Sequence, residues 1–379
     1  PLPVLHFGET ENPYNSQEEC YMHFFETLDS AIAVLKDVVE NNPDAKPLEE
    51  VDALYHGDYS KWLKLANSVK LRLAMRICYV KPDLAKQYAM EAVRDGVMET
   101  ADDSALFQSW GSITIINPLE KIWNGYSDTR MGASMDSYLN GYNDPRLPVY
   151  FQPVTEGDNK GEYRGVANGM PNPQQDDYKA MSAPNVQEKS TDSPLRWMMA
   201  SEVAFLRAEG AMRGWTAEMG GTAEEFYNKG IELSFLENGL SADAAARYAA
   251  DETSKPTDFT DVSAANTKYN ISALGKITIK WNAGASEEEQ LERIITQKWI
   301  AMFPNGTEAW SEFRRTGYPL IFPVRSNYPT SGVDTNKQIR RMVFPQSEYS
   351  NNGAAVQEAV KLLGGPDNGG TKLWWDKKN

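Results

Sequence analysis

The residues best suited to bind a ligand are aromatic, and many of them lie between residues 101 and 196. In this stretch Asn-Pro, Asp-Pro and Pro-Asn-Pro steps are frequent and no long helical period survives. Flat indole and phenol rings can stack on the C–H faces of sugars with little loss of conformational entropy. Neighbouring polar side chains can then bond to hydroxyl groups and fix orientation. The candidate ligand-binding residues are Trp110, Trp123, Tyr126, Tyr142, Tyr163, Tyr178, Asn124, Asp128 and Arg130.

The same rings have a structural interpretation. Small satellite clusters of aromatic side chains commonly pin long loops onto a helical scaffold. Loops of this length in a compact chain are either functional or disordered, and a high aromatic content argues against disorder. Both interpretations stay open at the level of the sequence.

Residues for bond-making chemistry are poorly represented. Adjacent carboxylates occur at 102–103, 176–177 and 287–289, but each run is typical of solvated caps or loops, not of a glycosidase pair. Neither a nucleophile elbow nor a phosphate-binding loop is present. Two cysteines and three histidines leave little from which to build a zinc or haem site. We therefore predict a protein that is not an enzyme and has no cofactor; calcium held by oxygen ligands remains possible but is not indicated.

Charge and hydropathy exclude two further classes of protein, those that bind nucleic acid and those that span a membrane. The net charge of -15 leaves no surplus of lysine and arginine with which to bind nucleic acid. No stretch approaches 18 uncharged apolar residues, so no membrane span is predicted. The first ten residues lack the basic and apolar segments of a signal peptide, so none is predicted here, and this does not place the protein in the cytosol. Cys20 and Cys78 lie in apolar helical patterns, which favours two buried thiols over a disulfide.

The elements that must position these residues are mainly helical. Ser16 and Glu19 form a capping-box pattern before a long apolar stripe, and further helices are predicted at 59–80 and 82–96. Arg72 and Arg76 lie in the helix predicted at 59–80. Buried guanidinium groups there would pair with carboxylates such as Glu202 or Glu209.

Helical periodicity returns after residue 196. Two helices, 197–213 and 222–237, are joined by a short glycine-containing turn and have the dimensions of one tetratricopeptide unit. Further helices are predicted at 286–303, 305–317 and 354–363. The fold class is mainly α: a tetratricopeptide-like helical repeat scaffold with a loop-rich irregular region. The Asp-Pro-Arg step at 144–146 is interpreted as a turn with a salt-bridging arginine.

Specific motifs within this pattern resemble the SusD/RagB family. The run KWLKLANSVKLRLAMRI at 61–77 resembles the signature helix of that family, and PYNSQEECYMHFFETLDSAIAVL at 13–35 the helix before it. Other segments keep the family's order along essentially the whole chain: NDPRLPVYF (143–151), SEVAFLRAEGAMRGW (201–215) with YNKGIELS (227–234), QKWIAMFPNGTEAWSEFRRTGYP (297–319), RRMVFPQSEYSNNG (340–353) and LWWDKK (373–378).

The resemblance implies a single SusD-like domain over residues 1–379. Within it we distinguish a helical repeat region at 16–100, the loop-rich candidate ligand-binding region at 101–196, a helix pair at 197–240 and a C-terminal segment at 286–379. Family members carry a lipid-anchored cysteine and further helices, including a first repeat, ahead of the part that begins here. That N-terminal portion is expected to be missing from this chain.

The resemblance also implies a function. Members are cell-surface lipoproteins of the outer membrane of Bacteroidetes-type bacteria, and they pass a captured oligosaccharide to a SusC-like TonB-dependent transporter. Two alternatives remain: a receptor of the same family for peptides or another non-sugar nutrient, and a tetratricopeptide scaffold that binds proteins on a concave helical face.

Overall fold

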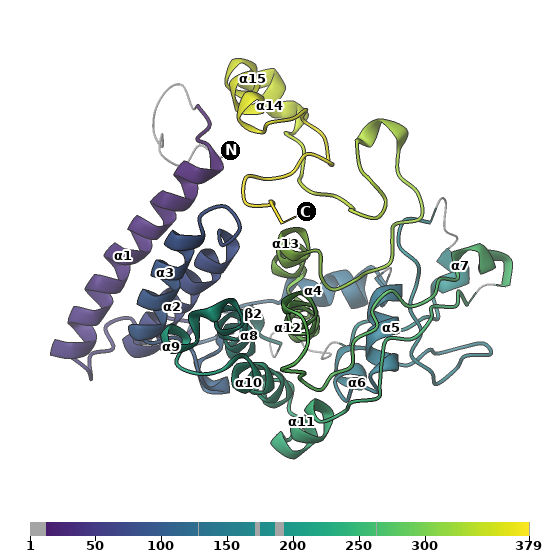
Figure 1. Cartoon of the computed structure of the whole chain (residues 1–379), viewed down its shortest axis with the longest axis horizontal. Helices are drawn as coiled ribbons and strands as arrows, with labels where there is room; N and C mark the ends of the chain where they lie inside the picture. The colour runs from purple at the N-terminus through teal and green to yellow at the C-terminus, as the bar shows by residue number, and fades with distance from the viewer. Residues whose placement is uncertain (1–12, 128, 171–174, 186–192, 263, 379) are drawn as a thin grey trace.

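The computed structural model describes residues 13–127, 129–170, 175–185, 193–262 and 264–378. The fold is mainly helical, as predicted (Figure 1). Within the described ranges the only strands are β1 (Ala105–Phe107) and β2 (Leu195–Met198), which pair antiparallel. None of the helices in these ranges is both long and apolar enough to span a bilayer.

Three N-terminal helices, α1 (Gln17–Asn41), α2 (Tyr59–Arg76) and α3 (Pro82–Arg94), lie side by side, with α2 contacting both others (Figure 1). The predicted capping box is confirmed: the backbone amide of Glu19 donates to Ser16 Oγ over 3.2 Å, and the carboxylate of Glu19 accepts from the Ser16 amide over 2.8 Å. The helix α2 is four residues shorter than predicted because residues 77–80 form a turn.

The second helical group comprises α8 (Ala200–Gly210), η4 (Ala211–Trp215), α9 (Thr216–Met219), α10 (Ala223–Leu236) and α11 (Ala242–Ala249). The helices α8 and α10 pack along each other, and Gly230 permits their approach because a Cβ there would lie 2.7 Å from the Phe205 ring. The prediction of a helix from residue 197 was wrong at its start. Residues 195–198 pair with β1, and tertiary pairing overrides the local helical pattern.

Between these groups the chain runs through η1 (Ala101–Asp103), α4 (Pro118–Glu120), η2 (Lys121–Gly125), α5 (Ala133–Gly141), α6 (Leu147–Tyr150) and α7 (Gln175–Tyr178), joined by loops. The helix α5 escaped prediction because it buries polar side chains, which breaks the apolar period. Its Asp136 carboxylate accepts from the Gly165 amide over 2.6 Å, and Ser137 Oγ donates to the Thr257 carbonyl over 2.5 Å.

The C-terminal third contains η5 (Ala264–Tyr269), α12 (Glu287–Ala301), α13 (Gly306–Thr316), η6 (Pro329–Ser331), α14 (Gln346–Asn351) and α15 (Gly353–Leu362). Figure 1 shows α12 and α13 in the middle of the molecule, between the N-terminal helices and the loop-rich half around α5 to α7. The predicted end of α13 is confirmed, with Gly317 at a φ of 82° directly after it.

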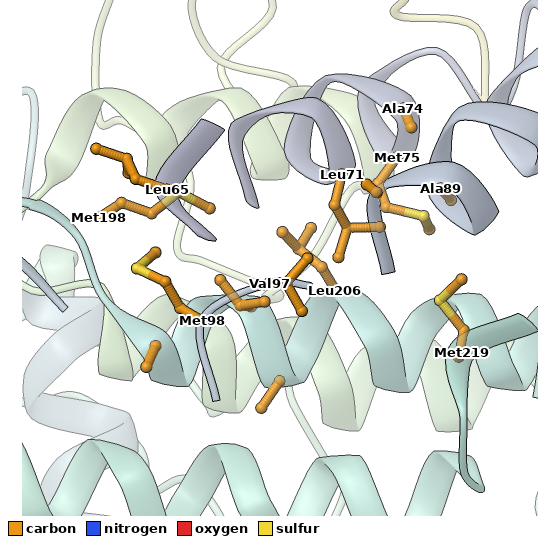
Figure 2. Packing of buried hydrophobic residues seen from close by; sticks show 14 of the residues in the cluster. Leu65, Leu71, Ala74, Met75, Ala89, Val97, Met98, Met198, Leu206 and Met219 are labelled. Carbon is orange, nitrogen blue, oxygen red and sulfur yellow. The ribbon is translucent and has the colours of Figure 1, made fainter. Parts of the chain in front are cut away.

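The helical core is apolar where α2 faces α8. Leu71 and Met75 of α2 and Leu206 of α8 are almost completely buried, and Figure 2 shows these three side chains with Met198 and Met219 in one layer. Burying a side chain of this size contributes about 1.5–3 kcal/mol. This packing holds the N-terminal helices onto the tetratricopeptide-like pair.

Buried ion pairs cross the same scaffold. The Arg72 guanidinium donates to both carboxylate oxygens of Glu202 over 2.7 Å each, as predicted. Arg76 does pair with carboxylates, but with Glu308 and Glu312 of α13 and not with Glu202 or Glu209. The signature helix is therefore joined to α8 and α13 by charge, and its arginines have structural roles. Cys20 and Cys78 are both buried, as predicted.

Arg315 lies at the centre of these pairs. Its guanidinium lies 2.6 Å from Glu209 of α8 and 2.6 Å from Glu312, and Lys298 of α12 bonds to Glu312 over 2.9 Å. Burial opposes ionisation of Glu209, but Arg315 and Arg213 outweigh it and lower the pKa of this carboxyl to about 2. The group remains ionised at neutral pH.

Candidate ligand-binding cleft

A cleft of about 690 Å³ lies where three segments distant in sequence meet. They are residues 117–123 at α4 and η2, residues 193–198 at β2, and residues 303–307 at the start of α13; side chains of α2 and α6 complete the wall. Ligand pockets typically measure about 300–1,000 Å³. The first segment lies within the loop-rich region, the second crosses its C-terminal boundary at residue 196, and the third comes from the C-terminal segment.

Trp123 enters this cleft from η2. The preceding helix α4 begins at Pro118, and Asn117 caps it by accepting the Leu119 amide on Oδ1 over 3.0 Å. The Trp123 ring lies nearly parallel to that of Phe303, with centroids 5.9 Å apart and an angle of 15°. The ring of Phe303 also contacts that of Tyr150, with centroids 4.8 Å apart. Rings from three segments therefore form one apolar wall.

Trp197 supplies a second indole. It lies on β2 and stacks on Phe107 of β1 with centroids 5.1 Å apart and an angle of 16°. The strand pairing fixes the two backbones, yet 51% of Trp197 remains exposed. An exposed indole supported from one side by another ring is suited to stack a ligand ring.

Amide side chains supply the polar part of the lining: Asn117, Asn185, Asn238 and Asn305, with the hydroxyls of Ser193 and Thr307. An amide both donates and accepts, which matches a ligand rich in hydroxyl groups. Asn117 is itself held, because its Nδ2 donates to the carbonyls of Ser193 and Pro194 over 3.2 and 3.3 Å. It joins two walls of the cleft to each other.

The structure separates the predicted ligand-binding residues. Of the seven whose side chains the structure describes, only Trp123 lies among the residues that line the cleft. Tyr126 follows it on the chain and is 61% exposed, with Lys121 Nζ 5.8 Å from its ring centroid. Trp110 is elsewhere: its ring stacks on His56 at 3.5 Å, and its Nε1 donates to the Glu49 carbonyl over 2.6 Å.

Three predicted tyrosines pack against apolar clusters. Tyr142 is 1% exposed in the core that surrounds α5 and α12, and Tyr163 packs against the same core. Tyr178 is buried with Val154 and Met181, and its hydroxyl lies 3.3 Å from Asp261 Oδ1. For Tyr142 and Tyr178 the structural alternative describes the arrangement: these rings pin loops onto the scaffold.

The predicted polar residues divide in a similar way. Arg130 donates to the carbonyls of Thr129 and Lys179 over 2.7 and 2.6 Å, and so joins two loops. Asp128 and the side chain of Asn124 lie outside the described residues. No group of three or more His, Cys, Asp or Glu side chains converges in the described part of the chain, so no calcium ligands can be named from it.

Sequence reasoning missed Phe303, Trp197 and the amides beyond residue 180. The predicted helix at 286–303 includes Phe303, whereas α12 ends at Ala301 and leaves Phe303 in the turn before α13. Trp197 was assigned to a helix. No local signal indicated that residues 117–123, 193–198 and 303–307 meet in space.

Residues 1–376 match the family model described as SusD-like, Susd and RagB outer membrane lipoprotein. No curated protein sequence matched significantly.

Several solved structures are similar over nearly the whole chain. A chitin-binding SusD homologue from Flavobacterium johnsoniae is 42% identical with a TM-score of 0.91, over 99% of this chain and 76% of that one. A SusD-like protein from Bacteroides thetaiotaomicron is 43% identical with a TM-score of 0.91, over 99% and 76%. A SusD homologue from Bacteroides vulgatus is 36% identical with a TM-score of 0.92, over 100% and 75%.

Proposed function

The chain belongs to the SusD/RagB family of outer-membrane lipoproteins, and we propose that it captures an oligosaccharide in the cleft formed by residues 117–123, 193–198 and 303–307. SusD-like proteins bind nutrients and are not enzymes. The chain is accordingly a binding protein of the outer membrane, and its proposed task is recognition without bond chemistry.

The observation that carries the proposal is the composition of the cleft wall. Trp123, Phe303 and Trp197 contribute rings, with the buried Tyr150 behind Phe303, and amide side chains line the same cleft. Rings can stack on the C–H faces of a sugar while amides bond to its hydroxyl groups. The chitin-binding relative supports the assignment to a glycan. Of the rings predicted from the sequence, Trp123 has the central role here, and the exposed Tyr126 extends the same segment.

Delivery to a SusC-like TonB-dependent transporter belongs to the same proposal and rests on the family resemblance. A lipid anchor places such a receptor at the membrane surface, above the barrel that it serves. The captured glycan then passes to the transporter without chemical change.

A protein-binding scaffold is the second candidate, because a groove of about 780 Å³ lies between α10 and α11. Its lining is alternately charged and small, with Glu224, Glu232 and Asp243 beside several alanines. The only ring in that lining is Trp281, which is buried. This groove suits a peptide segment better than a sugar, so peptide binding tests it.

Titration calorimetry against a panel of oligosaccharides that includes chitohexaose, with a matched panel of hexapeptides, tests the proposal. We expect a glycan to bind and Trp123→Ala to lower its affinity about tenfold, since the variant removes a stacking ring. Trp110→Ala removes an indole outside the cleft and is the matched control, which should bind normally.

Binding of peptides but of no glycan would refute the assignment to a sugar. Equal losses in Trp123→Ala and Trp110→Ala would place the site outside the cleft.

A further inference from the structure

The cleft differs in charge from the rest of the protein. The chain has 53 acidic residues against 38 basic ones, yet the described residues that line the cleft include no aspartate or glutamate. Two arginines do line it, Arg72 of α2 and Arg196 of β2. Their surroundings decide whether the cleft carries a positive charge that a ligand can use.

Arg72 is neutralised within the protein. Its guanidinium forms a two-pronged contact with Glu202, whose side chain is almost completely buried, and both bonds measure 2.7 Å. Two parallel N–H groups of the guanidinium are thus occupied by the carboxylate, the partner to which they fit best. Arg72 therefore brings little net charge into the cleft.

Arg196 has neutral partners. Its guanidinium donates to Asn238 Oδ1 over 3.0 Å and to the Glu237 carbonyl over 3.4 Å. These two bonds use two of the five N–H groups that a guanidinium offers. Among the described residues no carboxylate lies within 4.0 Å of its side-chain nitrogens, and the group is only half-buried.

The Glu237 carboxylate interacts electrostatically with Arg196 but forms its hydrogen bonds with two serines. Glu237 accepts from the Ser201 amide over 2.9 Å, from Ser201 Oγ over 2.5 Å and from Ser104 Oγ over 3.0 Å. Burial raises the pKa of Glu237 above its ordinary value although Arg196 and these hydrogen bonds act to lower it. The three hydrogen bonds occupy the Glu237 carboxylate, and Arg196 acts on it through space.

We infer that the cleft selects saccharides that carry an anionic group, a carboxylate or a sulfate, and that Arg196 binds that group. The inference rests on the proposed function and narrows its ligand class. A guanidinium has parallel N–H groups that can donate to two oxygens of one carboxylate or sulfate. Asn238 holds Arg196 in place, since its Nδ2 donates in turn to the Ser234 carbonyl over 2.6 Å.

The preference should be measurable as a ratio of affinities. A charge-assisted hydrogen bond to a ligand is worth about tenfold or more in affinity. A ligand that lacks the anion leaves Arg196 without its partner and loses that factor. The rings of the cleft bind both forms alike, so the ratio isolates the charge.

The test uses calorimetry with three probes: a hyaluronan hexasaccharide, the same hexasaccharide with its carboxyl groups reduced to alcohols, and chitohexaose. A chondroitin sulfate hexasaccharide and its desulfated form distinguish sulfate from carboxylate recognition. The wild-type protein should prefer an acidic probe to its neutral form about tenfold. Arg196→Gln should abolish this preference, Arg196→Lys should retain part of it, and Arg247→Gln, a substitution on the exposed face of α11, should retain all of it.

Equal affinity for acidic and neutral forms would overturn the inference and leave the proposed function intact. An acidic preference that persists in Arg196→Gln would also overturn it, by assigning the charge recognition elsewhere. Failure of every hexasaccharide to bind would count against the proposed function itself. Thermal melting of each variant verifies that the fold is retained.

Discussion

Arginine has opposite surroundings in two regions of this molecule. In the helical scaffold Arg315 is fully buried between Glu209 and Glu312, and Arg146 is fully buried against Asp144, as the predicted turn with a salt-bridging arginine requires. In the cleft, Arg196 is half-buried and bonds to an amide and a carbonyl. A charge whose partners are supplied internally stabilises architecture, whereas a charge at a cleft wall with neutral partners is available to a ligand.

Aromatic rings show the same division. Tyr142 and Tyr178 come from the loop-rich region but are buried in apolar clusters. Trp123, from the same region, and Trp197, just beyond it, line the cleft. Aromatic content alone therefore does not separate a binding platform from a loop anchor; the neighbours of each ring do.

The largest effect that tests this comparison should come from Arg315→Met. The variant leaves two buried carboxylates without their main partner, and breaking such a pair costs about 3–5 kcal/mol. Urea unfolding measures the loss, with the exposed Arg247→Gln as a control that should change stability by less than about 0.5 kcal/mol. A loss below about 1 kcal/mol in Arg315→Met would show that the buried pairs are not structural.

Acid should weaken the scaffold through Glu209. Because its pKa is lowered from 4.5 to about 2 in the folded protein, its contribution is complete above pH 4.5 and is lost as pH falls towards 2. The free energy of unfolding, measured in urea at pH 6 and pH 3, should decrease more in the wild type than in Glu209→Gln. Identical decreases would contradict the assigned role.

A smaller effect is expected for Trp197→Ala in the cleft. Removing the half-exposed ring should weaken glycan binding by about 0.5–1.5 kcal/mol and change stability little. Calorimetry with the glycan identified for the wild type gives the affinity, and Trp310→Ala is a matched control because that indole lies outside the cleft. Unchanged affinity in Trp197→Ala would confine the platform to Trp123 and Phe303.

The smallest effect should come from Glu292 of α12. Burial raises the pKa of its carboxyl from 4.5 to about 7, so the stability it contributes below pH 4.5 is lost as pH rises through 7. Glu292→Gln should therefore be more stable relative to the wild type at pH 8 than at pH 4. Melting temperatures at pH 4 and pH 8 test this. In the exposed Glu358→Gln variant, the difference in melting temperature from the wild type should be the same at both pH values.

Local signals in the sequence are enough to predict most of the long helices and the family. Ser16 with Glu19, Thr222 with Glu225 and the apolar stripe of α2 are local signals, and each acts within about one or two helical turns. The pairing of Arg72 with Glu202 was foreseeable because a buried guanidinium must find a carboxylate. The choice of Glu308 and Glu312 for Arg76 was not, since those residues lie on a helix more than two hundred positions away.

The position of the cleft depends on long-range packing. Trp123, Trp197 and Phe303 come from separate segments, and no periodicity records that their rings meet. Whether a ring faces solvent depends on packing against residues far along the chain, which buries Tyr142 and leaves Trp197 half exposed. Local sequence specifies backbone conformation through short-range interactions, whereas a binding surface arises from the long-range packing of elements that those interactions have already formed.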